Sequence, residues 1–225
     1  MSAAGIALAI ALAGLPEAAG AHHLGTYTPR DNEISANFKQ LKFSMEARKF
    51  DVALRLFEDG AVRREMREQA ARLPAGLEAA TRAGLSASDA QEVERALMVF
   101  LAALARNLTL EAQQQVGAPG VGPEARMAAG RLFLEAVWRY YNLIDYAASR
   151  RAPKISVAVR LAFDDAEGLA KGPASPVAAA PASGTKAAVT PVPVDPVKLR
   201  EPLQRIAQAL GELIEVSSPR TRRES

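Results

Sequence analysis

Two adjacent histidines, His22 and His23, are the only imidazoles in the chain, and they follow a run of small residues. Imidazole is a common ligand of transition metals, and an imidazole close to a free α-amine suits Cu(II) or a similar ion. If a leader is removed after Ala21, His22 becomes the first residue and chelates through its amine and its ring. Removal after Gly20 places His23 third, where amine, two amides and imidazole form a square plane. Both cleavage sites therefore predict a metal site at the mature N-terminus.

The leader is itself predicted by the apolar run Gly5–Leu15, which a proline and an acidic residue end. Such a run resembles the hydrophobic core of a secretory signal and is too short for a bilayer span, which needs about 20 apolar residues. The residues before it lack the usual Lys or Arg. We expect residues 1–21 to be a signal peptide, the mature protein to be periplasmic or secreted, and no membrane span to remain after cleavage.

Composition argues against most catalytic arrangements. The 225 residues include no cysteine, and the body of the chain has no histidine, so thiol and Ser-His-Asp chemistry is not expected there. The glycine-rich stretch 117–123 contains prolines and lacks the lysine of a phosphate-binding loop. The net charge of +3 comes from basic clusters without interleaved aromatic residues, so no nucleic-acid partner is expected. We predict a non-enzymatic protein.

The elements that would position any site are helical. From residue 32 onward, apolar residues recur at helical spacing, beginning with Ile34, Phe38, Leu41 and Met45. The phase slips near residues 47–49, which leaves open whether a long helix continues or the chain turns. We expect an all-α bundle of about five to six helices over residues 22–171.

The two longest predicted helices follow one another, and the first of them is expected at the centre of this bundle. One runs over about residues 89–115 and is apolar on almost every face between Arg95 and Arg106, which predicts complete burial. The next runs from Pro123 to about Arg150 and carries the segment "WRYYNLIDY". Aromatic residues at this spacing pack in cores, and they also line ligand pockets. A pocket around Trp138–Tyr146 therefore stays open as an alternative.

The C-terminal third changes in composition. Residues 172–196 are rich in proline and alanine and contain no aromatic residue, which predicts a disordered linker. An amphipathic helix is expected over residues 197–216, followed by a flexible basic tail over residues 217–225. Because short isolated helices are marginally stable, the apolar seam of this helix must dock on its own bundle or on a partner protein. The seam consists of Leu199, Leu203, Ile206, Leu210 and Leu213.

Together these patterns predict an exported, non-enzymatic helical binding or interaction protein. The first alternative is a periplasmic metal-handling protein that binds Cu(II) or a similar ion through His22 and His23. The second is an enzyme or ligand binder with its pocket around Trp138–Tyr146.

Overall fold

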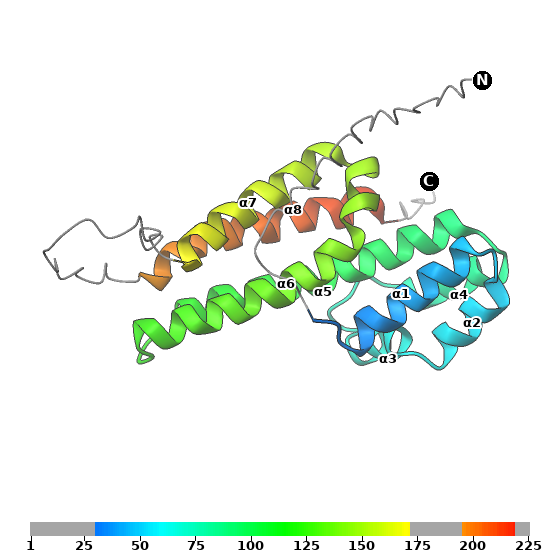
Figure 1. Cartoon of the computed structure of the whole chain (residues 1–225), viewed down its shortest axis with the longest axis horizontal. Helices are drawn as coiled ribbons and strands as arrows, with labels where there is room; N and C mark the ends of the chain where they lie inside the picture. Colours follow the sequence, from blue (N-terminus) through cyan, green and yellow to red (C-terminus); the bar gives the residue numbers. More distant parts are fainter. Residues whose placement is uncertain (1–29, 172–194, 219–225) are drawn as a thin grey trace, which may run out of the picture.

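The computed structural model describes residues 30–171 and 195–218, and within these ranges it contains helices and no strand. The predicted all-α class is therefore confirmed. Figure 1 shows the path of the chain. The elements are α1 (Glu33–Glu46), α2 (Phe50–Glu58), α3 (Ala61–Glu68), α4 (Leu77–Ser86), α5 (Ala90–Val116), α6 (Pro123–Arg151), α7 (Pro153–Lys171), the 3-10 turn η1 (Pro196–Leu199) and α8 (Arg200–Ser217).

The number of about five to six helices expected up to residue 171 is too low, because residues 30–171 form seven α-helices, and α8 corresponds to the separately predicted C-terminal helix. The chain turns at the phase slip, where Arg48 adopts a left-handed backbone with φ of 57°. It turns again at Gly60, where an added Cβ would lie 2.2 Å from the Oδ1 atom of Asn37. The buried Asn37 amide donates to the Leu56 carbonyl at 3.0 Å and accepts from the Val62 amide at 3.0 Å. This tertiary contact divides a helical stretch that local periodicity leaves continuous.

Helices α5, α6, α7 and α8 form an antiparallel four-helix bundle, in which each helix runs opposite to the next (Figure 1). Helix α8 closes the bundle because it packs on both α7 and α5. The central position predicted for α5 is confirmed, since every residue from Ala96 to Ala105 is buried. Apolar area removed from water contributes roughly 25 cal/mol per Å², so this bundle holds the main source of stability.

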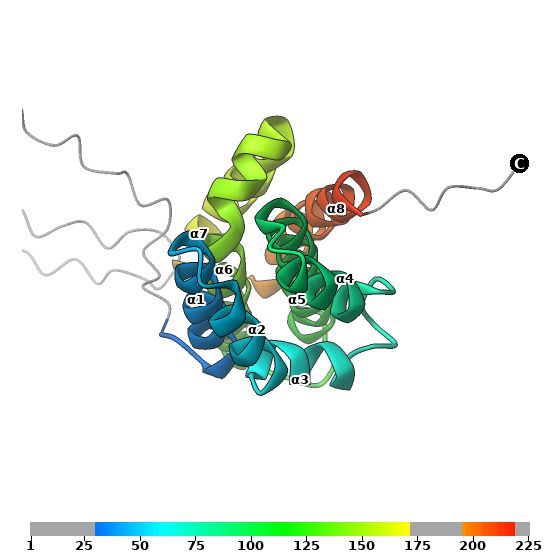
Figure 2. The same cartoon turned by 90° about the vertical axis from the view of Figure 1, so that its right-hand side faces the viewer.

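Helices α1 to α4 gather around one end of the bundle, beside the first half of α5 and the second half of α6 (Figures 1 and 2). They are short and bury few apolar side chains: α2 buries only Ala53 and Phe57. Helix α1 packs chiefly on α2 and α3 and touches α6 only lightly. The space between α1, α5 and α6 is where the candidate site lies.

Polar residues and proline fix the ends of several helices. Asn32 forms a capping box with Ser35 at the start of α1. Asp89 caps α5 by accepting from the Glu92 amide at 3.0 Å, whereas the neighbouring Ser88, which has capping-box spacing, adopts a positive φ and does not cap the helix. Pro123 occupies the first turn of α6, as expected from its missing amide hydrogen.

The C-terminal element begins slightly earlier than residue 197. Asp195 caps η1 by accepting from the Val197 amide at 3.1 Å, and Pro196 is buried. Gly130 on α6 makes room for this turn, since an added Cβ would lie 2.9 Å from the Leu199 side chain. None of the described helices is both long enough and apolar enough to cross a membrane.

Candidate functional site

An apolar cavity lies between α1, α5 and α6, and its volume is about 180 Å³. Helix α1 contributes its buried face, α5 contributes five residues from its first three turns, and α6 contributes residues from its second half. The apolar walls are formed by Phe38, Met45, Leu97, Met98, Leu143, Ile144 and Ala147.

The side chains of these walls explain why the three helices leave a space. Phe38 and Met45 belong to the same face of α1 and are buried, yet α1 has little direct contact with α6. Ala147 is small, so the α6 wall is shallow where larger residues would close the gap. Met45 and Met98 are flexible and polarisable, and such side chains adapt to groups of varied shape. The cavity therefore has the lining of a ligand pocket.

Polar side chains form the rim of the cavity rather than its walls. Glu46, Gln91 and Glu94 are exposed, whereas the main wall residues are buried. Lys42 and Glu46 approach each other at 4.0 Å on one side of the opening. An exposed pair at that distance contributes little to stability, so the rim charges remain available to a ligand.

A second depression adjoins the cavity at the end of α6. Its volume is about 250 Å³. It adds three arginines, Arg95, Arg150 and Arg151, to residues that already line the apolar cavity. The shared residues are Gln91, Glu94, Met98 and Ala147. An apolar hollow and a cationic surface are therefore continuous.

A larger hollow of about 520 Å³ lies between α3, α5 and α6 and is mainly polar. Its lining includes Glu65, Arg72, Glu111 and the Tyr140 ring. Arg72 and Glu111 are exposed, and the Tyr140 hydroxyl already accepts a hydrogen bond from Asn32 at 2.8 Å. Burial raises the pKa of this tyrosine. Water can satisfy the exposed polar groups of this hollow. The hollow is therefore weaker evidence of a ligand site than the apolar cavity is.

The segment Trp138–Tyr146 belongs mostly to the core. The Trp138 ring lies 5.0 Å from the Phe163 ring, centroid to centroid, in an edge-to-face contact. The buried Tyr141 hydroxyl donates to the Ser156 hydroxyl at 3.2 Å, and burial raises the pKa of Tyr141 well above its usual range. Leu143 and Ile144 are the members of the segment that reach the apolar cavity.

The acidic residue of the same segment is engaged in an ion pair. Asp145 accepts hydrogen bonds from the guanidinium group of Arg160, with the Arg160 Nε atom at 2.9 Å, and from the Ser156 hydroxyl at 3.3 Å. The hydrogen bond to Asp145 raises the pKa of Arg160. These contacts join α6 to α7 and satisfy polar groups that burial would otherwise leave unpaired.

The predicted docking seam lies inside the protein's own bundle. Its five side chains are at most 1% exposed, and they pack in the same core as α5 and α7. The Arg95 guanidinium also donates to the Ser217 carbonyl at 2.9 Å, which ties the last turn of α8 to α5. In this structure the seam therefore docks in cis. The five seam residues are Leu199, Leu203, Ile206, Leu210 and Leu213.

The predicted metal ligands His22 and His23 lie outside the described residues, so the copper-site hypothesis stays a prediction. Within residues 30–171 and 195–218, no group of three or more histidine, cysteine, aspartate or glutamate side chains is placed to hold a metal ion. The predicted signal peptide, most of the predicted linker and most of the predicted basic tail also lie outside the described residues, so these predictions stay untested.

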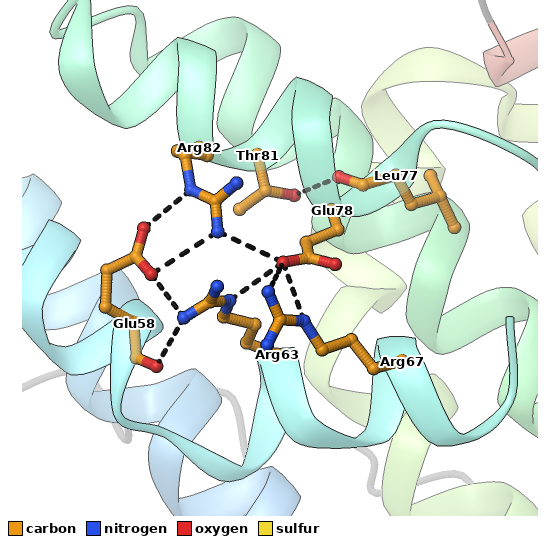
Figure 3. A network of polar contacts seen from close by, with 7 residues as sticks. All are labelled: Glu58, Arg63, Arg67, Leu77, Glu78, Thr81 and Arg82. Carbon is orange, nitrogen blue, oxygen red and sulfur yellow. Dashed lines mark hydrogen bonds and ion pairs between the residues drawn. The ribbon is translucent and has the colours of Figure 1, made fainter.

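A network of charged side chains joins α2, α3 and α4 (Figure 3). The Oε1 atom of Glu78 accepts from Arg63 Nε at 2.8 Å, from Arg67 Nε at 2.9 Å and from Arg82 at 3.1 Å. Arg82 Nε also donates to Glu58 at 2.6 Å. Hydrogen bonds from Arg67 and Arg63 lower the pKa of Glu78 to about 2. The network therefore connects three short helices. It offers no free anion site, because each of its arginines already has a carboxylate partner.

Comparison with protein-family models, with curated proteins and with solved structures gives no match for this chain.

Sequence reasoning placed the α1 and α5 walls of the cavity in the core, and its alternative pocket segment Trp138–Tyr146 supplies only Leu143 and Ile144 to the cavity. Phe38 and Met45 follow the apolar period of α1, as a core helix requires. One available signal was the presence of Met45 and Met98 on separate helices, since methionine is over-used at adaptable binding surfaces. The cavity residues of α1, α5 and α6 come together although each helix's contribution lies more than 40 residues from the next in the sequence.

Proposed function

We propose that this chain is a non-enzymatic binding protein that takes a small apolar group into the cavity between α1, α5 and α6. The observation that supports the proposal is a surface-accessible hollow with apolar walls and a polar rim. Ligand pockets typically combine such walls with a few polar groups that orient the ligand. The predicted leader over residues 1–21 would place this binding activity in the periplasm or outside the cell.

The volume of the cavity sets the size of the group. A cavity of about 150 Å³ with leucine, isoleucine and phenylalanine walls is large enough for benzene. At about 180 Å³, this cavity suits a single ring or a short alkyl chain. Small ligands gain between about 0.3 and 1.5 kcal/mol per non-hydrogen atom. For a six- to eight-carbon group these values bound the binding free energy between about 2 and 12 kcal/mol, and a millimolar to micromolar affinity, about 4 to 8 kcal/mol, lies in the middle of that range.

The two methionines on the cavity walls provide a direct test. In protein with ¹³C-labelled methionine methyl groups, titration with octan-1-ol should shift the signals of Met45 and Met98 in a saturable manner. The signals of Met66 and Met127, which do not line this cavity, should stay in place. Equal shifts at all four methyl groups, or none at Met45 and Met98, would contradict the proposal.

A variant that obstructs the opening tests the same site independently. Ala90 is exposed in the first turn of α5 and lines the cavity, so Ala90→Trp should weaken octan-1-ol binding at least about tenfold by occupying the entrance. Ala83→Trp on α4 is the matched control, because Ala83 is exposed and does not line the cavity. Equal binding by the two variants would place the alcohol elsewhere.

A further inference from the structure

The polar surface beside the cavity indicates the chemical class of the ligand. The depression that contains Arg95, Arg150 and Arg151 shares Met98 and Ala147 with the apolar walls. A molecule whose apolar part fills the cavity would therefore place its other end close to these arginines. The inference that follows depends on the proposed function, because it concerns the second half of the same ligand.

The three arginines differ in how far they are already occupied. Arg95 donates to both carboxylate oxygens of Glu92 and to the Ser217 carbonyl, and its side chain is only 10% exposed. Arg95 therefore belongs to the framework of the depression.

Arg150 and Arg151 have unused hydrogen-bonding capacity. Both are exposed, and neither forms an ion pair with any residue in the described part of the chain. The Arg150 guanidinium carbon lies 5.8 Å from the centroid of the Tyr146 ring, and this cation–π contact leaves the guanidinium N–H groups free at their edges. Two guanidinium groups are thus available at the same margin of the cavity.

The acidic residues nearby reduce this positive charge without cancelling it. Glu94 lines both the cavity and the depression and has no ion pair among the described residues. Glu46 lies at the far side of the opening, where Lys42 is its neighbour. Two unpaired cations therefore oppose one unpaired carboxylate at the shared margin, and the local excess is positive.

We propose that the ligand is a short amphiphile with a carboxylate head, such as a medium-chain fatty acid. The chain enters the apolar cavity and the carboxylate binds Arg150 and Arg151. A guanidinium group presents two parallel N–H donors that match the two oxygens of a carboxylate. The same geometry does not suit an alcohol, and an ammonium group would be repelled.

Three probes with the same chain length separate the head from the tail. Octanoate, octan-1-ol and octylamine are each titrated at pH 7 into the methionine-labelled full chain, with the Met45 and Met98 methyl signals as the readout. We expect octanoate to bind about tenfold more tightly than octan-1-ol, since charge-assisted hydrogen bonds are worth at least about one factor of ten. Octylamine should bind no more tightly than the alcohol.

The charge contribution is tested with the double variant Arg150→Gln/Arg151→Gln. Octanoate affinity should fall to the level of octan-1-ol, while octan-1-ol affinity stays unchanged. Lys49→Gln/Lys198→Gln is the matched control, because it removes the same charge at exposed positions away from the cavity. Glu94→Gln should strengthen octanoate binding severalfold by removing the opposing carboxylate.

The outcomes distinguish this inference from the function on which it depends. If octan-1-ol binds and octanoate has no advantage, or if the double arginine variant keeps that advantage, the carboxylate inference is wrong and the cavity function stands. If octylamine binds most tightly, Glu46 and Glu94 form the head-group site and the inference is overturned. If no probe shifts Met45 and Met98, the proposed function fails as well.

Discussion

The two halves of this molecule share one apolar core but contribute to it very unequally. Helices α5 to α8 are joined by a continuous apolar core, in which residues such as Leu101, Leu134 and Leu210 are completely buried. Helices α2 to α4 are short and add fewer residues to this core, among them Phe57, Met66 and Leu85, and the charge network around Glu58 and Glu78 also joins them across their partly exposed faces. Apolar burial contributes in proportion to area, whereas partly exposed ion pairs contribute about 1 kcal/mol or less each.

This difference implies a hierarchy of stability within one fold. The region of α2–α4 should open at lower cost than the α5–α8 bundle, since local stability follows the amount of buried apolar contact. The apolar cavity lies at the boundary between the halves: Phe38 and Met45 come from α1, and the other walls come from α5 and α6. The ligand pocket therefore combines one lightly held wall with two firmly held walls.

The largest effect is expected from a charge in the bundle core. Ile206 is 0% exposed, so Ile206→Asp should lower the free energy of unfolding by at least about 4 kcal/mol. Gln208→Asp, at an exposed position of the same helix, should change it by less than about 0.5 kcal/mol. Urea unfolding followed by circular dichroism measures both. Equal stability of the two variants would mean that α8 does not close the bundle in solution.

A smaller effect is expected in the charge network. Glu78→Gln removes the carboxylate shared by three arginines and should cost about 1 kcal/mol, because water partly screens these side chains. Glu68→Gln on α3 is the control, since Glu68 is exposed and has no ion pair among the described residues. Amide hydrogen exchange should show the loss of protection in α3 and α4, with α5 unaffected. Uniform loss across all helices would contradict the proposed hierarchy.

The ionisation of Glu78 should also make the free energy of unfolding depend on pH. The pKa of Glu78 is about 2 in the folded protein and 4.5 as the ordinary value, so its stabilising contribution is complete above the ordinary value. This contribution is lost as the pH falls from about 4.5 toward 2. Urea midpoints measured at about pH 5 and pH 3 should therefore differ less in Glu78→Gln than in the unchanged protein. An identical drop in both would assign the acid sensitivity to other groups.

The smallest effect concerns a polar contact inside the apolar half. Tyr141→Phe removes the hydroxyl that donates to Ser156 at 3.2 Å, and the expected cost is about 0.5–1 kcal/mol. Tyr146→Phe, on an exposed ring, should be neutral. In an alkaline absorbance titration, the unchanged protein should keep one more tyrosine protonated above the ordinary pKa of 10 than Tyr141→Phe does. Ordinary ionisation of all tyrosines would contradict the burial of this hydroxyl.

Local patterns in the sequence were sufficient for most of the helices. The apolar run before Arg106 predicted the buried centre of α5, and the 4-3-4-3 spacing predicted the seam of α8. Local patterns were insufficient where a residue distant in sequence determines the local backbone conformation. Asn37 fixes the turn at Gly60 through hydrogen bonds with Leu56 and Val62, which lie 19 and 25 residues further along the chain. The helix count was too low for that reason.

The candidate site was far less accessible to sequence reasoning. A cavity is defined by what packing fails to fill, and its walls have the same periodicity as ordinary core positions. The charge network poses a similar difficulty, because Glu58 and Arg82 are 24 residues apart and belong to separate helices. Spacing along the chain does not reveal such pairs, which the structure shows between Glu58 and Arg82 and between Glu78 and three arginines.

By itself, the sequence determined the all-α class, the central burial of α5 and an apolar seam on the last helix, because amphipathic periodicity is a property of neighbouring residues. Only the tertiary structure decided where that seam docks, which charges pair and where the apolar cavity opens beside Arg150 and Arg151. These features arise from contacts between helices distant in sequence, where the shapes and charges of several surfaces must be satisfied together.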